Sequence, residues 1–265
     1  MQEYIYSPKN LYYRTNEFKI GRPVLVFVHG ISGSSSAWKL YEEKFGQDYN
    51  ILTFDLRGHG KSGKFKKLED YEIKKFAEDL FDLVAFLKIE HFTLIGHSFG
   101  VLVVFSFLEK HLNMVEKLVL LSPSYAPNKI LMSKILKPLF SLIGLLKIFP
   151  LNLERRGHVD YSKFINTSDW YIPRMIEDVG ITSLHVYLYG SKNSYDVNYE
   201  SLLDKIKIPT LIMHGQKDTI FPVAHAKFIH DKIKNSQLII LENSNHILVL
   251  NNFAEVSEAI IKFLK

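Results

Sequence analysis

Short apolar runs of strand length recur along the chain. The first covers residues 23–28 and stops at His29-Gly30. Apolarity within these runs is continuous rather than alternating, which is typical of a strand covered on both faces in a parallel sheet. Five further runs follow the same pattern, at residues 51–54, 92–95, 115–121, 209–213 and 237–241.

Helical periodicity lies between most of these runs. Residues 71–87 place apolar side chains on one helical face, and residues 101–112 and 253–264 have a similar pattern. Alternation of strands and helices predicts an α/β fold with a doubly wound, mostly parallel sheet. Residues 1–22 are interpreted as a strand or hairpin around the turn signal Ser7-Pro8-Lys9-Asn10.

The alternation breaks once, between residues 121 and 209, where aromatic residues and lysines replace it. We therefore predict a core formed by residues 1–123 and 199–265, with residues 124–198 inserted as short helices over one end of the sheet. In open α/β sheets ligands bind outside the carboxyl ends of the strands, so a cap at that end would cover the site. The apolar stretch 131–149 is interpreted as the core of this cap, with contact to lipid as the alternative.

Composition excludes several classes of protein and site. The 265 residues include no cysteine, so a disulfide, a thiolate metal site and a cysteine nucleophile are excluded. A reducing compartment fits this composition, and we expect a cytoplasmic protein without a signal peptide. The longest apolar stretch, residues 130–151, is interrupted by Lys134, Lys137, Pro138 and Lys147, so we expect no membrane-spanning segment.

The formal net charge of +5 comes mainly from lysines scattered along the chain. Nucleic-acid-binding proteins usually concentrate their basic residues on one face. No such concentration is visible here, and we expect a solvated lysine-rich surface and no nucleic-acid partner. The sequence leaves the oligomeric state open.

The sharpest local signal is Gly96-His97-Ser98-Phe99-Gly100, which lies between an apolar strand and a helix. A nucleophilic serine at a strained strand-to-helix turn needs small neighbours, and the two glycines supply them. The following helix would direct its positive end at the site. The alternative is an ordinary turn serine, which the strand-and-helix context disfavours.

A serine hydroxyl needs a base to become a good nucleophile. His246 is the candidate because it follows the last apolar run and precedes the final helix, whereas the ten other histidines have structural or solvated explanations. Asp218, in the loop after residues 209–213, would orient the imidazole, and its alternative role is to cap that loop. The chain order Ser98, Asp218, His246 is the one expected for this architecture.

Two backbone N–H groups are expected to bind a developing oxyanion, those of Phe99 and of Ile31 in the glycine-containing loop 29–33. The competing interpretation of this loop, a phosphate cradle, lacks both the lysine and the glycine spacing that it requires. Gly30 and Trp170 are the expected substrate-binding residues.

Five ordered segments of the chain, named at the end of this paragraph, resemble motifs of the α/β-hydrolase superfamily. The resemblance covers nearly the whole chain and is greatest to the capped serine esterase and lipase branch. Val101 and Asn245 stand where many relatives have glycine, which leaves the subfamily open. Serine at position 98 argues against the epoxide hydrolase and haloalkane dehalogenase branches, which have aspartate there. The matching segments are Phe27-Val28-His29-Gly30, Asp55-Leu56-Arg57-Gly58-His59-Gly60-Lys61-Ser62, Gly96-His97-Ser98-Phe99-Gly100, Gly215-Gln216-Lys217-Asp218 and Asn245-His246.

The resemblance implies a serine hydrolase that cleaves a small-molecule carboxylic ester or thioester, with an apolar acyl or alcohol group, through an acyl-enzyme. It implies no cofactor and no metal. Carbon–carbon bond hydrolases, lactonases, acyltransferases and cofactor-free perhydrolases or haloperoxidases share the same three residues. From another class, a ligand receptor with little turnover is the alternative, whereas the intact set of residues disfavours a scaffolding role.

Overall fold

The computed structural model describes residues 1–129 and 156–265. Within these residues one eight-stranded sheet has the order β1-β2-β4-β3-β5-β6-β7-β8. β1 and β2, and β2 and β4, pair antiparallel, and the other neighbours pair in parallel. The strands are β1 (Gln2–Tyr6), β2 (Leu11–Thr15), β3 (Val24–Val28), β4 (Asn50–Phe54), β5 (Phe92–His97), β6 (Val115–Leu121), β7 (Thr210–Gly215) and β8 (Ser236–Leu241).

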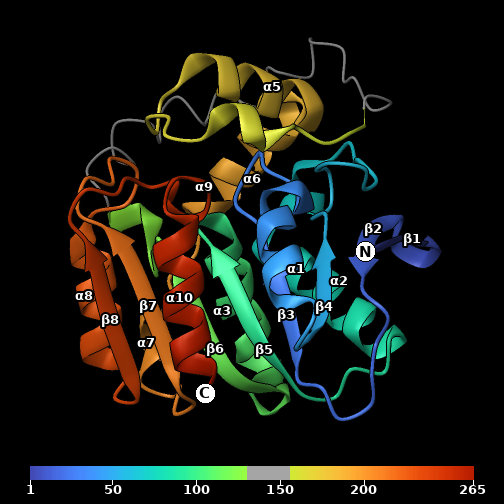
Figure 1. Ribbon diagram of the computed structural model, residues 1–265. Coiled ribbons are helices and arrows are strands. Elements are labelled where there is room, and N and C mark those ends of the chain that lie inside the picture. The colour runs from blue at the N-terminus through green and yellow to red at the C-terminus, as the bar shows by residue number, and fades with distance from the viewer. Residues whose placement is uncertain (130–155) are drawn as a thin grey trace.

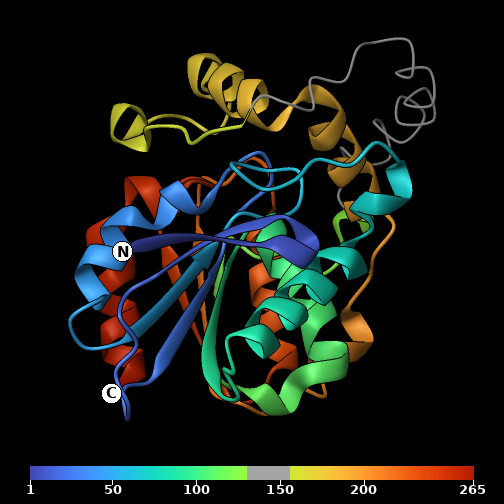
Figure 2. The same ribbon diagram turned by 90° about the vertical axis from the view of Figure 1, so that its right-hand side faces the viewer.

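Helices cover both faces of the sheet (Figure 2). In β3, Val26 and Val28 pack into the core shared with α2, α3 and α8, whereas Leu25 and Phe27 pack into the core shared with α1 and α10. A strand buried on both faces has no polar side, which explains its continuous apolarity. The helices are α1 (Lys39–Phe45), α2 (Ile73–Phe86), α3 (Phe99–His111), α5 (Ile172–Thr182), α6 (Leu184–Ser194), α7 (Glu200–Leu203), α8 (Val223–Lys232), α9 (Leu248–Asn251) and α10 (Phe253–Leu264).

The predicted fold class is confirmed. Each of the six apolar runs coincides with a strand, and the predicted amino-terminal hairpin is the antiparallel pair β1–β2, in which Tyr6 lies opposite Leu11. The turn between them contains Asn10 at φ 51°, a conformation that asparagine tolerates better than most residues. This hairpin adds the antiparallel edge to an otherwise parallel sheet.

Residues 156–198, here called the overlying segment, contain α5 and α6 and lie across the carboxyl ends of the strands (Figure 1). They fall within the predicted cap 124–198, whose boundaries stay a prediction. The stretches 131–149 and 130–151, on which the expectations about lipid and membrane contact rest, both lie outside the described residues. Among the helices that the structure does describe, none is long and apolar enough to span a membrane.

Candidate active site

Ser98 lies at the turn from β5 into α3, where the sheet and the helix meet. Its backbone has φ 54° and ψ −118°, a conformation that side-chain-bearing residues rarely adopt. The two glycines of the motif make this turn possible. A Cβ at Gly96 would lie 2.9 Å from a methyl carbon of Val104, and a Cβ at Gly100 would lie 2.5 Å from the carbonyl oxygen of Val28.

The structure brings Ser98, His246 and Asp218 together from three distant parts of the chain. The Ser98 Oγ lies 2.6 Å from His246 Nε2, and His246 Nδ1 lies 2.7 Å from Asp218 Oδ2. Ser98 and His246 are only 5% and 6% exposed. Short, buried hydrogen bonds of this kind fix the imidazole between the hydroxyl and the carboxylate.

Both carboxylate oxygens of Asp218 take part in hydrogen bonds. Its Oδ1 accepts the backbone N–H groups of Ile220 and Phe221, each at 2.8 Å, so the predicted loop cap exists beside the contact with His246. Burial pushes the pKa of Asp218 upward, but the neighbouring His246 and His214 and these hydrogen bonds outweigh it and hold the pKa below its usual range. The carboxylate therefore stays ionised beside the imidazole.

The backbone of His246 is also fully bonded, through residues that the sequence patterns did not single out. Its N–H donates to Asp169 Oδ1 at 2.8 Å. Its carbonyl oxygen accepts from Ser122 Oγ at 2.9 Å and from His97 Nε2 at 3.0 Å. The position of His97 beside Ser98 in the motif could have indicated a role at the site. Nothing in the sequence around Asp169 indicates one.

His97 serves as a neutral donor. Burial, and the proximity of His246, lower the pKa of His97 to about 3. A neutral imidazole that donates from Nε2 leaves Nδ1 without a proton. This Nδ1 lies close to Gly30, since a Cβ added at Gly30 would lie 3.1 Å from it. His97 thus connects the His246 loop with the loop after β3.

The two residues predicted to supply oxyanion donors belong to the segments next to Ser98. Phe99 is the first residue of α3, where N–H groups have no partner within the helix. Ile31 follows Gly30, where an added Cβ would lie 3.4 Å from the Cβ of Ser98. Among the described residues neither N–H donates a hydrogen bond. Their assignment as oxyanion donors stays a prediction.

The overlying segment contacts this region through α6. A Cβ at Gly190 would lie 3.2 Å from Ile31 Cδ1 and 3.8 Å from the ring of Phe99. Trp170, predicted to bind substrate, instead donates its indole N–H to Thr219 Oγ1 at 3.0 Å and is 54% exposed. Its assignment to substrate binding, like that of Gly30, stays a prediction.

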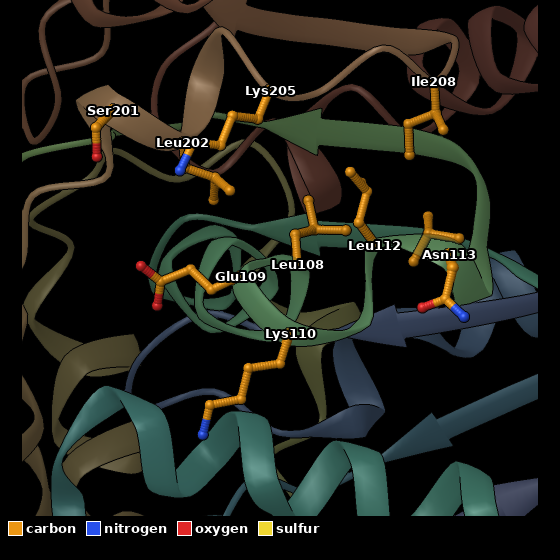
Figure 3. A pocket seen from close by; sticks show the side chains of 10 residues that line it. Leu108, Glu109, Lys110, Leu112, Asn113, Ser201, Leu202, Lys205 and Ile208 are labelled. Atoms are coloured by element: carbon orange, nitrogen blue, oxygen red, sulfur yellow. The ribbon is translucent and has the colours of Figure 1, made fainter.

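A surface groove of about 680 Å³ lies away from Ser98, at the other end of α3 (Figure 3). Leucines form part of its lining, with Glu109 and Lys205 beside them. It lies beyond reach of the serine, since α3 itself separates the two. In residues 1–129 and 156–265 no group of three or more histidine or carboxylate side chains is arranged to hold a metal ion.

Comparison with known proteins agrees with this architecture. The family described as alpha/beta hydrolase fold matches residues 23–253. The AB hydrolase superfamily protein YisY of Bacillus subtilis is 28% identical over 99% of both chains, and the proline iminopeptidase PfmaB of Pestalotiopsis fici is 31% identical over 84% of this chain and 85% of its own. The crystal structure of MGS-M2, an α/β-hydrolase enzyme from a deep-sea metagenome library, aligns with a TM-score of 0.79 at 21% identity, over 99% of this chain and 97% of that one. The chain belongs to the α/β-hydrolase family.

Proposed function

We propose that the protein is a serine hydrolase that cleaves a carboxylic ester or thioester through an acyl-enzyme. The observation that carries the proposal is the continuous hydrogen-bonded relay from the Ser98 hydroxyl through His246 to the ionised Asp218. A hydroxyl in this setting can lose its proton to the imidazole as it attacks, while the carboxylate stabilises the imidazolium.

In the first half-reaction, Ser98 Oγ attacks the acyl carbon and its proton passes to His246 Nε2. The substrate carbonyl oxygen becomes an oxyanion, to which the N–H groups of Ile31 and Phe99 donate. Removing one such donor in other hydrolases costs roughly 3 kcal/mol of transition-state stabilisation. The tetrahedral intermediate then collapses, and His246 returns its proton to the departing alcohol or thiol.

In the second half-reaction, water attacks the acyl-enzyme and gives its proton to His246. Collapse of this intermediate releases the carboxylic acid and returns the proton to Ser98. The mechanism uses only groups of the chain itself. The apolar character of the acyl or alcohol group and the predicted cytoplasmic location belong to the same proposal, supported by the tyrosine- and leucine-rich composition of the insertion and by the absence of cysteine.

Covalent labelling by a fluorophosphonate probe tests the proposal. Wild-type protein should be labelled at Ser98, and Ser98→Ala should remove the label, because the probe forms a bond only with an activated hydroxyl. Ser257→Ala provides a matched control and should keep the label, because this serine is also buried but its hydroxyl donates to the carbonyl of Ala254 within α10. Labelling that survives Ser98→Ala would contradict the proposed nucleophile.

A substrate panel then separates the related activities. p-Nitrophenyl esters of increasing acyl length should be turned over, whereas meta-cleavage diketones would be preferred by a carbon–carbon bond hydrolase. Proline p-nitroanilide belongs in the panel because one relative is named as a proline iminopeptidase. Labelling without measurable turnover of any substrate would favour a ligand receptor.

A further inference from the structure

Asp169, in the overlying segment, joins the two loops that hold His246 and Asp218. Its side chain is buried, with the residue only 5% exposed. Oδ1 accepts the backbone N–H of His246 at 2.8 Å, and Oδ2 accepts the backbone N–H and the hydroxyl of Thr219 at 2.9 and 2.7 Å. Thr219 directly follows Asp218, so one carboxylate spans both loops.

The hydrogen bonds around Asp169 run in a consistent direction. Trp170 donates its indole N–H to Thr219 Oγ1, and that hydroxyl donates onward to Asp169. Arg174 donates to the backbone carbonyl of Asp169 at 2.7 Å, and this hydrogen bond fixes the backbone of Asp169. Both oxygens of the Asp169 carboxylate thus accept hydrogen bonds, as a buried polar group requires.

Neighbouring bonds attach the same stretch of chain to the His246 loop. The carbonyl oxygen of Thr167 accepts from Asn245 Nδ2 and from Asn251 Nδ2, both at 2.8 Å. Asn245 immediately precedes His246, so residues 166–170 bind this loop at two adjacent positions. Asn245 stands where many α/β-hydrolases have glycine, and its side chain makes a contact that glycine has no atoms to make.

We propose that Asp169 is a positioning residue for the reaction, which sets the distance between the imidazole of His246 and the carboxylate of Asp218. The inference rests on the proposed function. Asp169 accepts from the backbone N–H groups of His246 and Thr219, and it bonds neither to the Ser98 hydroxyl nor to the imidazole ring of His246. Without it, the buried His246 N–H would lose its acceptor and Thr219 would lose both of its hydrogen bonds to the carboxylate, and the two loops would relax toward other partners or water.

The test compares Asp169→Ala and Asp169→Asn with wild type by the rate of fluorophosphonate labelling and by kcat and KM for a p-nitrophenyl ester. A misplacement of about 1 Å can cost on the order of 100-fold in rate, so Asp169→Ala should slow labelling and kcat by about 10- to 100-fold. KM should change little, because the substrate contacts remain. Asp169→Asn keeps one acceptor oxygen and should lose less.

Asp178→Asn is the matched control. Asp178 is likewise a buried carboxylate of the overlying segment, but its hydrogen bonds to Tyr161 and Arg174 remain within that segment. It should label at the wild-type rate within about twofold, because Arg174, the partner shared with Asp169, keeps its hydrogen bond to the Asp169 carbonyl and the bonds of the Asp169 side chain to both loops are unchanged. Equal slowing in both variants would reduce the role of Asp169 to general stability and overturn the inference.

Should Asp169→Ala fail to fold by circular dichroism, Asp169→Asn and Thr219→Val carry the test. Thr219→Val preserves side-chain shape but removes one donor, and it should slow labelling less than Asp169→Asn does. Wild-type rates in both would overturn the inference while the proposed function stands. Wild-type protein that takes no label at all would instead contradict the proposed function.

Discussion

His246 is bonded at all four of its polar atoms. Its ring nitrogens contact Ser98 and Asp218, its N–H donates to Asp169, and its carbonyl accepts from Ser122 and His97. An imidazole that must accept and return a proton within one geometry gains from such restraint, because little reorganisation remains for the reaction step. The ring edge also packs against Phe221, which limits its tilt.

Asp218→Asn should lower kcat by on the order of 10⁴, with the protein still folded. The amide cannot hold the imidazole in the tautomer that leaves Nε2 free to accept from Ser98, nor can it stabilise the imidazolium. Steady-state turnover of a p-nitrophenyl ester measures the loss. Among the described residues no second carboxylate contacts the imidazole ring, so a nearly unchanged rate would contradict the role of Asp218.

The helix α3 is fixed against β3 and β5 by its first turn. Gly100 packs against the carbonyl oxygens of Val28 and His29, leaving no space for a side chain. This close approach directs the amino-terminal end of α3, and with it the N–H of Phe99, toward Ser98. The partial positive charge at that end favours negative charge on a nearby oxygen.

α5 carries a buried carboxylate that titrates in the mildly acidic range. Burial raises the pKa of Asp178 to about 6, against the hydrogen bond from Tyr161 and the charge of Arg174, which lower it. Between its ordinary value and about pH 6 the folded protein holds a proton that the unfolded chain has released. Folding is therefore favoured on the acidic side of this range, and this contribution is lost as pH rises through 6.

Asp178→Asn should remove this pH dependence. The free energy of unfolding of wild type relative to the variant should fall by up to about 3 kcal/mol as pH rises from 4 to 7, because one pKa unit corresponds to about 1.4 kcal/mol. Urea unfolding of both proteins at several pH values in this range measures the difference. A difference that stays constant with pH would contradict the assignment.

The described part of the overlying segment pairs with no strand of the sheet and is attached to the rest of the molecule mostly through side-chain hydrogen bonds. His158 Nε2 lies 2.7 Å from Oδ2 of Asp55, which is fully buried in the core. Ser36 Oγ donates to the carbonyl of Val159 at 2.9 Å, and Thr182 Oγ1 donates to that of Ser32 at 2.9 Å. Because these contacts are hydrogen bonds between loops and side chains rather than strand pairing, we expect the amides of this segment to exchange faster than those of the sheet.

His158→Ala should loosen the overlying segment selectively. Loss of a hydrogen bond to a buried carboxylate costs roughly 1–3 kcal/mol, and amide hydrogen exchange should accelerate in residues 156–198 while β3 and β5 stay protected. His91→Ala is the control, because His91 is an exposed histidine at the opposite end of β5. Uniform acceleration across the sheet in His158→Ala would contradict this separation.

The sequence by itself determined the sheet and the three side chains of the proposed catalytic set, Ser98, Asp218 and His246. Continuous apolar runs can be stable only where both faces of a strand are covered, and the glycine spacing around Ser98 permits few backbone paths, so both features follow from local chemistry. Asp218 and His246 were predictable because each follows a strand whose carboxyl end must meet the same edge of the sheet.

Only the tertiary structure decided what supports these residues. Asp169 lies 77 positions before His246, in a stretch without a repeating pattern, and its contacts depend on how the overlying segment packs. The hydrogen bond from the Trp170 indole N–H to Thr219 Oγ1 likewise joins segments 49 positions apart, and no local pattern indicates it. Local periodicity indicates which faces of a helix or strand are buried. Contacts between loops depend instead on side-chain packing across the whole molecule, which no short stretch of sequence can specify.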